Sequence, residues 1–259
     1  MTTTPPAGEP ATDRSVLRLA GSTRETFLQG LVSNDLDRLK DGLVYAALLS
    51  PQGKYLSDFL LVPQPDAILI DVAAPFADAL VRRLTMYRLR ADVQIAAADI
   101  PVTRGLGPAP DGAFADPRHP ALGWRAYGSA AAGPAAIDWD AIRVEHLIPE
   151  TGIELIPDET YILEAGFERL HGVDFRKGCY VGQEVTARMK HKTDLRKGLA
   201  RVTVDGAAAV GTEITAEGKV VGTLFTRSGD QAIAYLRFER AGGAMLAGAA
   251  RVRIGSPRA

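Results

Sequence analysis

Short apolar runs separated by polar breaks fill the first hundred residues, and this pattern predicts a sheet with two helices. Runs of five to eight residues rich in aliphatic and aromatic side chains predict strands at residues 16–20, 44–50, 55–62, 67–72 and 92–97. The segment Pro51–Lys54 has the Pro and Gly of a tight hairpin turn. The spacing of apolar residues predicts one helix after the first strand and another after Pro75. This order of elements indicates an α+β domain with antiparallel hairpins.

The first predicted helix begins with the spacing of a capping box. Ser22 is followed three residues later by Glu25, so that each side chain would satisfy a backbone amide of the first turn. The apolar residues from Phe27 to Val32 then fall on one helical face. Asn34 and Asp35 are expected to end this helix.

The second half of the chain has a different pattern. A stretch rich in Gly, Pro and Ala covers residues 101–134, with one strand predicted at Trp124–Tyr127, and a helix is expected at Ile137–Leu147. From Leu199 to Ile254, short apolar runs separated by glycines predict a small antiparallel barrel or sandwich. The predicted domains are a disordered tail (1–14), an α+β domain (15–194) and a C-terminal β-barrel domain (195–259).

Composition narrows the class of protein. The 259 residues include 30 Lys and Arg against 31 Asp and Glu, so a broad basic surface for stable nucleic-acid binding is not expected. No apolar run approaches the ~20 residues that span a bilayer, and the N-terminus lacks the apolar core of a secretory signal. The single cysteine excludes an internal disulfide and fits a reducing compartment. A cytoplasmic protein that does not bind membranes is the resulting expectation.

The segment 171–192 holds the single cysteine among glycines and cations. Arg176, Lys177 and Gly178 directly precede Cys179, and a helical pattern begins a few residues later. Two cations and a helix N-terminus favour a thiolate, the form of cysteine that acts as nucleophile and metal ligand. The alternative is a small buried apolar residue, the commoner state of a free cysteine. Residue chemistry leaves both interpretations open.

Polar residues beyond the cysteine also allow two interpretations. Gln183 and Glu184 could hydrogen-bond a pterin-like ring, although solvated carboxylates and amides are more frequent. The basic run from Arg188 to Lys197 could end a helix or form a patch for an acidic protein, a polyglutamate tail or RNA. The four histidines have no metal-site spacing, and nucleotide-binding and hydrolase motifs are missing.

The motif KGCYVGQE, Lys177–Glu184, closely resembles the signature of the YgfZ group of folate-binding, GcvT-like proteins and their mitochondrial relatives. Three further stretches agree with that group in order and spacing, and so does the predicted barrel sequence VGTLFTRSGDQAIAYLR. The three stretches are FLQGLVSNDL (27–36), LLSPQGKYLSDFLL (48–61) and YRLRADVQI (87–95). The resemblance thus extends over nearly all of the chain from Val16 onward.

The resemblance implies a GcvT-like fold, in which ferredoxin-like α+β units surround a folate-sized cavity and a β-barrel follows. It implies tetrahydrofolate or a derivative as cofactor, and a role in the assembly or repair of [4Fe–4S] clusters. The implied partners are A-type iron–sulfur carrier proteins and iron–sulfur client enzymes, including radical-SAM enzymes that modify tRNA.

The resemblance also implies roles for individual residues. The functional cysteine of the group falls on Cys179, which would supply one ligand to a cluster shared with a partner, and its adjoining lysine falls on Lys177. Folate contacts are expected at Asn34, Asp35, Arg90, Gln183 and Glu184.

The aminomethyltransferases of the glycine cleavage system share the implied fold and are the main alternative. Their motif resembles K-x-D-F-x-G-K-E, with aspartate where this chain has Cys179. Their catalytic aspartate would fall near Asp71 or Asp78, where the surrounding residues do not match. We therefore expect an assembly factor rather than an enzyme, with residual one-carbon transfer or a non-catalytic folate-binding adaptor as alternatives.

Overall fold

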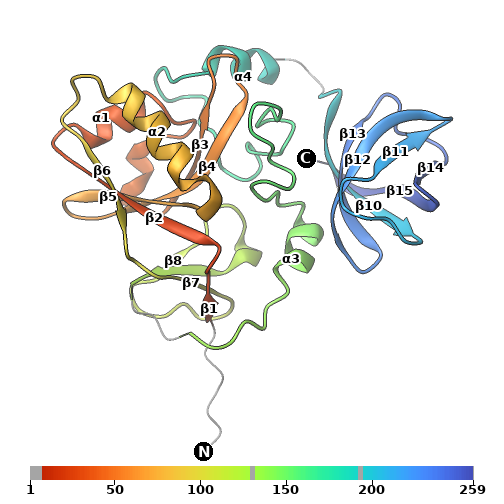
Figure 1. The fold of residues 1–259 in the computed structure, drawn as a ribbon, viewed down its shortest axis with the longest axis horizontal. Coiled ribbons are helices and arrows are strands. Elements are labelled where there is room, and N and C mark those ends of the chain that lie inside the picture. The colour runs from red at the N-terminus through yellow and green to blue at the C-terminus, as the bar shows by residue number, and fades with distance from the viewer. Residues whose placement is uncertain (1–7, 129–131, 192–194, 259) are drawn as a thin grey trace, which may run out of the picture. The chain divides into compact units, whose positions relative to one another are not determined.

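The computed structural model describes residues 8–128, 132–191 and 195–258, and the chain forms two compact units (Figure 1). The first unit comprises residues up to 52 together with 56–137 and 170–183, and the second comprises 53–55, 138–169 and the residues from 184 onward. The predicted boundary between the α+β and barrel domains adjoins residues 192–194, which lie outside the described residues.

The first unit contains nine strands and two α-helices among its described residues. They are β1 (Gly8–Pro10), β2 (Arg14–Ala20), α1 (Arg24–Gln29), β3 (Val44–Leu49), β4 (Tyr55–Pro63), β5 (Ala67–Ala73), α2 (Ala77–Arg88), β6 (Gln94–Ala98), β7 (Val102–Gly105), β8 (Phe114–Ala115) and β9 (Trp124–Tyr127).

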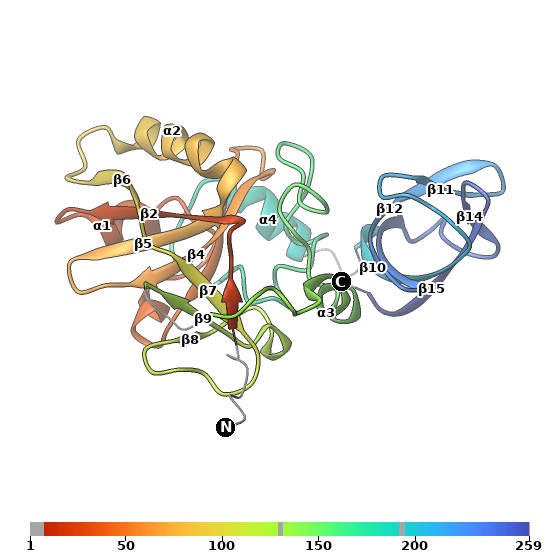
Figure 2. The same cartoon turned by 60° about the horizontal axis from the view of Figure 1, so that its bottom comes forward.

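A five-stranded antiparallel sheet with the order β3-β4-β5-β2-β6 forms the centre of this unit. Helix α2 packs across β2 and β6 (Figure 2). One apolar cluster joins the sheet to both helices, with Leu28 from α1 and Leu80 and Leu84 from α2 buried against Leu19, Ile70 and other strand residues. The segment Ala67–Ala73, which is apolar apart from Asp71, is buried at every position, as expected for a central strand.

The first helix is shorter than predicted, and its capping box does not form. Helix α1 ends at Gln29, and a 3₁₀ turn follows at Leu36–Lys40 with Asp35 as its N-cap. The backbone amide and hydroxyl of Ser22 both donate to Asp92 (3.1 and 2.6 Å), so Ser22 binds a distant carboxylate rather than its own helix. Tertiary hydrogen bonding overrides the local signal here.

A second sheet with the order β1-β7-β9-β8 includes part of the expected disordered tail. Residues 1–7 lie outside the described residues, but Gly8–Pro10 pairs with β7 and the carboxylate of Glu9 accepts from the amide of Ala136 (2.8 Å). The expectation of a tail extending to residue 14 is therefore wrong for residues 8–14. Backbone pairing supplies the order that the Pro- and Gly-rich sequence does not suggest.

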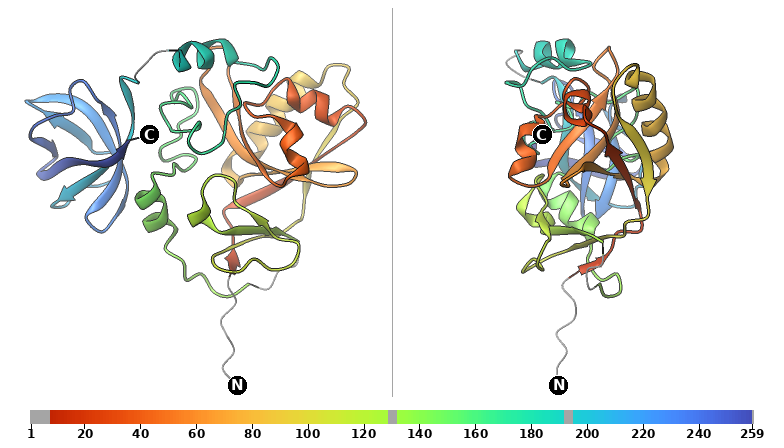
Figure 3. Two further views of the ribbon diagram at one scale, coloured as in Figure 1. Left: turned by 180° about the vertical axis from the view of Figure 1, so that it is seen from behind. Right: turned by 90° about the vertical axis from the view of Figure 1, so that its left-hand side faces the viewer.

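The second unit contains a closed β-barrel, drawn in blue in Figure 3. Its strands follow the order β10-β13-β12-β11-β14-β15, and α3 packs on β12 and β13. The elements are α3 (Trp139–His146), α4 (Gln183–Lys190), β10 (Lys197–Asp205), β11 (Glu213–Ala216), β12 (Lys219–Ser228), β13 (Gln231–Arg237), β14 (Met245–Ala247) and β15 (Ala250–Arg258). Helix α4 has its first residue, Gln183, in the first unit.

Buried charge holds α3 to the barrel within the second unit. Arg143 of α3 donates to Glu154 (2.8 Å) and to the hydroxyl of Thr226 on β12 (2.9 Å). Glu154 also accepts from the backbone amide and hydroxyl of Thr226 (3.1 and 2.6 Å). Because Arg143, Glu154 and Thr226 hydrogen-bond one another, part of the cost of burying this ion pair is offset.

Candidate functional site

Cys179 lies exposed in a loop that we call the cysteine loop, residues 171–182. Helix α4 begins at Gln183, four residues beyond the cysteine, so the thiol does not lie at a helix N-terminus as expected. Gly178 has no positive φ angle, and a Cβ at this position would meet nothing within 4 Å. Gly178 therefore does not use a backbone conformation that favours glycine, whereas Gly182 has a positive φ of 84°.

Lys177 is buried, and its ammonium fastens the cysteine loop to the end of α1. Its Nζ donates to the carbonyl oxygens of Gln29 (2.7 Å), Val32 (2.6 Å) and Asn34 (3.0 Å). Three donors thus meet three acceptors, which is the full capacity of a protonated lysine. Burial lowers the pKa of Lys177 to about 8, while the charges of Asp35 and Asp174 oppose this lowering.

Further hydrogen bonds join the same two segments. The hydroxyl of Ser33 donates to the carbonyl of Gly172 (2.6 Å) and accepts from the amide of Ala47 (2.8 Å). The side-chain amide of Asn34 donates to the carbonyls of Tyr45 (2.8 Å) and His171 (2.7 Å). The motif at 27–36 therefore holds the cysteine loop in place.

Asp174 organises the loop from within. Its carboxylate accepts from the backbone amides of Arg176 (2.7 Å) and Lys177 (3.2 Å) and forms an ion pair with Arg38 (2.7 Å). Burial would raise the pKa of Asp174, but the hydrogen bonds and charge of Arg38 and the two backbone amides hold it below its usual range. The carboxylate thus stays ionised and hydrogen-bonded at neutral pH.

The structure brings together only some of the residues predicted from the sequence. Lys177, Asn34 and Cys179 belong to one site. Asp35 is next to it and accepts from the side-chain amide of Gln29 (2.9 Å). Arg90 is exposed in the turn after α2, and among the described residues it makes no hydrogen bond or ion pair with the cysteine loop. The amide of Asn34 is engaged by backbone atoms, which leaves little of it for a ligand.

Gln183 and Glu184 form the start of α4. Glu184 is exposed and pairs with Arg188 one turn later (2.7 Å). An exposed pair of this kind contributes about 0.3–0.5 kcal/mol to a helix. A ligand role for these two residues stays a prediction.

Sequence reasoning did not single out Ser33, Arg38 or Asp174 as part of the site. Ser33 and Arg38 lie within or beside the motif at 27–36, and Asp174 lies three residues before Lys177. A signal was present in the sequence, because short polar side chains beside glycines often bind loop backbone. The pairing of two segments more than 130 residues apart could not be read from it.

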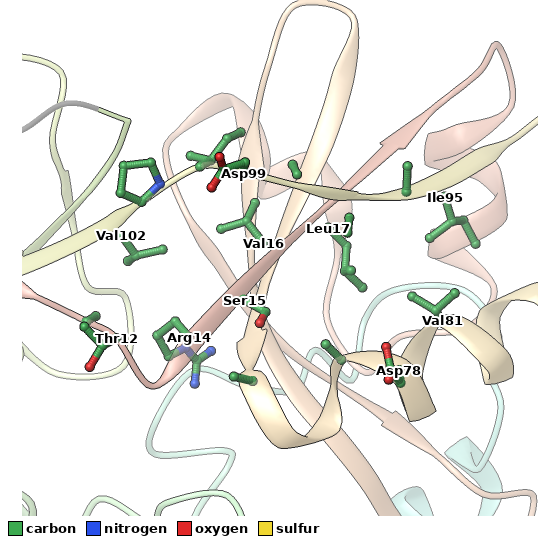
Figure 4. A pocket seen from close by; sticks show the side chains of 18 of the residues that line it. Thr12, Arg14, Ser15, Val16, Leu17, Asp78, Val81, Ile95, Asp99 and Val102 are labelled. Atoms are coloured by element: carbon green, nitrogen blue, oxygen red, sulfur yellow. The ribbon is translucent and has the colours of Figure 1, made fainter.

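Two pockets in the described part of the first unit are relevant to the site. One, of about 490 Å³, is lined by Asn34, Arg38, Tyr45, Phe114 and His171 among others. The other, of about 610 Å³, lies beside β2, β6 and the start of α2, where Thr12, Asp78 and Asp99 approach it (Figure 4). The larger pocket contains none of the predicted site residues, whereas the smaller one contains Asn34.

Asp71 is one of the two aspartates considered for one-carbon chemistry. Its carboxylate lies in a buried cluster of charged side chains. It accepts from Arg14 (2.6 Å), Arg125 (3.2 Å) and the hydroxyl of Tyr127 (2.9 Å). Burial would raise the pKa of Asp71, but Arg14 and Arg125 hold it below its usual range. Asp78 is exposed on α2. Neither aspartate is placed in the cysteine site.

The site therefore offers one accessible sulfur on a loop of fixed shape. Among the described residues, no group of three or more His, Cys, Asp and Glu side chains is arranged to hold a metal ion. A metal at Cys179 would take its other ligands from outside the described part of the chain. Within that part, no helix combines the length and the apolar character needed to cross a membrane.

The overall architecture matches a solved enzyme. The aminomethyltransferase T of the glycine cleavage system from Bartonella henselae superposes with a TM-score of 0.76 over 98% of this chain and 86% of that chain, at 15% identity. Residues 196–259 match the family model described as the CAF17 C-terminal beta-barrel domain. This is the aminomethyltransferase fold. The predicted GcvT-like α+β fold with a C-terminal β-barrel is confirmed.

Curated relatives narrow the resemblance further. The chain is 32% identical to the iron–sulfur cluster assembly factor IBA57 homolog of Mycosarcoma maydis, over 71% of this chain and 54% of that protein. It is 29% identical to human IBA57 and 28% identical to mouse IBA57, covering 76% of each and 88% and 87% of this chain. The chain thus spans about half the length of the fungal relative.

The similarity is to IBA57 proteins rather than specifically to the YgfZ group. All three relatives are named as mitochondrial proteins, which contradicts the expected cytoplasmic location. That expectation rested on the composition of the N-terminus, and composition is a weak guide to compartment.

Proposed function

We propose that this protein is an iron–sulfur cluster assembly factor in which Cys179 supplies one ligand to a cluster that is passed between partner proteins. The observation that carries this proposal is the exposed thiol on a loop that Lys177, Ser33 and Asn34 hold in place. The similarity to IBA57 assembly factors supports it. The cluster is cargo, and its remaining ligands come from the partner.

A thiolate ligand of this kind needs access and orientation. Exposure of Cys179 gives access to a protein-bound cluster, and the hydrogen-bonded loop limits the directions in which the sulfur points. The proposed partners are A-type iron–sulfur carrier proteins that deliver the cluster and client enzymes that receive it, including radical-SAM enzymes that modify tRNA.

The surroundings of Asp71 favour this proposal over folate-dependent aminomethyl transfer. A general base must approach the proton that it abstracts, and it works best with a pKa near the operating pH. Asp71 is completely buried, has three side-chain partners and has a lowered pKa. One-carbon transfer would need another base.

A reduced folate is a further part of the proposal, with the pocket of about 490 Å³ as its site. The volume lies in the range of ~300–1,000 Å³ that holds compact heterocyclic ligands. Arg38 and His171 would hold the ligand's carboxylate, and Tyr45 and Phe114 would face its rings. The ligand would provide a one-carbon carrier. Calorimetry with tetrahydrofolate tests whether the protein binds a reduced folate. Phe114→Asp should abolish this binding if the ligand occupies this pocket.

An anaerobic transfer experiment tests the role of Cys179. Wild type, Cys179→Ser and Gly178→Ala would each be mixed with an A-type carrier that holds a [2Fe–2S] cluster, while cluster absorbance and complex size are followed. We expect a cluster-bearing complex with wild type and Gly178→Ala but not with Cys179→Ser. Equal complex formation by all three proteins would overturn the assignment of the thiol as a ligand.

A further inference from the structure

A strained turn follows α2 in the first unit and presents an apolar side chain to solvent. Leu89 has φ 41° and ψ −103°, a combination that favours glycine because a Cβ crowds the backbone there. Its side chain is 89% exposed, so burial does not compensate for this conformation. Unfavourable backbone geometry that packing does not explain is concentrated at functional sites in proteins.

A second exposed apolar residue lies next to this turn. Met86, in the last turn of α2, is 69% exposed. Five large hydrophobic side chains are exposed among the described residues, and the other three, Val210, Val220 and Leu246, belong to the second unit. Within the described first unit, large exposed apolar side chains are thus confined to the end of α2.

Arginines surround these two side chains. Arg82 and Arg83 precede Met86 by four and three residues and share its helix face, and Arg90 directly follows Leu89. All three are exposed, and within the described part of the chain none of them has an ion pair or side-chain hydrogen bond. We call Arg82, Arg83, Met86, Leu89 and Arg90 the arginine–methionine patch.

We propose that the arginine–methionine patch is a docking surface for an acidic protein that inserts an apolar side chain between Met86 and Leu89. Three unpaired guanidinium groups match carboxylates, which they can bind in bidentate geometry. Arginine and methionine are enriched at protein interfaces, where a desolvated apolar centre is ringed by polar contacts. This surface is independent of the role proposed for Cys179.

The composition of the patch favours a protein over nucleic acid or lipid. Binding to a phosphate backbone rewards a long array of cations, whereas here three arginines lie on a chain of formal net charge −1. A phosphate backbone also gains nothing from two exposed apolar side chains. A membrane surface would call for a wider apolar face than Met86 and Leu89 provide.

Binding to synthetic peptides tests the proposal with the whole chain. The ligand is a fluorescent amphipathic helix of Glu, Ala and Leu, and the comparison peptide has the same charge with Gln in place of Leu. We expect the Leu peptide to bind more tightly, and Arg82→Glu or Met86→Gln to weaken it about tenfold. Lys219→Glu and Val220→Gln, the same changes at exposed barrel positions, should leave the affinity unchanged. Equal affinity for all variants, or for both peptides, would overturn the proposal.

Leu89→Gly separates docking from folding. Glycine adopts the backbone angles of this turn freely, so the melting temperature should stay the same or rise, while peptide affinity falls several-fold. If this variant binds the Leu peptide as tightly as wild type does, Leu89 is not part of the docking surface. Tighter binding of an equally charged oligonucleotide or of anionic phospholipid vesicles than of the Leu peptide would show that the partner is not an acidic protein.

Discussion

The cysteine loop and the turn at Leu89 both present a side chain to solvent, but they are held in opposite ways. The cysteine loop takes its shape from Lys177, Ser33 and Asn34, whose side chains bind backbone carbonyls of a distant segment. The turn at Leu89 has a strained backbone and an exposed side chain. A loop held by hydrogen bonds is suited to a group whose direction matters, such as a metal ligand. An exposed apolar residue, in contrast, gains its contacts only when a partner binds.

Removing the ammonium of Lys177 should cause the largest loss of stability, because it takes away the support that distinguishes the cysteine loop from the turn at Leu89. Lys177→Met keeps the apolar stem but leaves three carbonyl oxygens without their donor, and we expect a loss of about 2–4 kcal/mol in the free energy of unfolding. Urea unfolding measures it, with the exposed Lys219→Met as the matched control. Alkylation of Cys179 should change rate in Lys177→Met alone. Unaltered stability and thiol reactivity would mean that the three hydrogen bonds do not hold the loop.

A substitution at Gly182 should have an effect of intermediate size. Its φ of 84° lies where an L-residue is strained, so Gly182→Ala should cost about 1–2 kcal/mol and disturb the start of α4. Thermal unfolding and amide hydrogen exchange at Gln183 and Glu184 would report both effects. A variant as stable as wild type would show that the loop can reach α4 by another path.

The smallest effect is expected at Gly178, directly beside the cysteine. A Cβ there meets nothing within 4 Å and the φ angle is not positive, so Gly178→Ala should change the free energy of unfolding by less than about 0.5 kcal/mol. Urea unfolding of Gly178→Ala and Gly182→Ala under the same conditions measures the difference in stability. A larger loss at residue 178 than at residue 182 would reverse the order that the backbone angles predict.

Much of the fold could be predicted from periodicity. The hairpin at 51–54, the strand predicted at 67–72 and the strand at Trp124–Tyr127 all form, because apolar patterning and turn residues are local signals. The helix predicted from Ser22 to Asp35 failed beyond Gln29. There Ser22 binds Asp92, and the peptide groups beyond Gln29 bind Lys177 and other distant partners, which no local pattern contains.

The candidate site could be predicted only in part. Residue chemistry left Cys179 either exposed or buried, and the structure shows it exposed; its role as the centre of the site was implied by the resemblance of its motif and stays a prediction. The direction of Lys177 did not follow from the sequence, since a lysine beside a cysteine suggests a charge near the thiol, whereas the structure turns its ammonium toward carbonyl groups. The positive φ of His171, whose carbonyl Asn34 holds, is likewise a product of tertiary contacts.

The long sequence separation within the cysteine loop has a consequence during protein synthesis. The contacts of Lys177 and Ser33 join residues 139–148 positions apart in the chain. Closing so large a loop delays folding relative to local contacts. A ribosome-bound chain that ends before residue 177 has the first sheet strands but no anchored cysteine loop, so Cys179 reaches its exposed position only when translation of the first unit is complete.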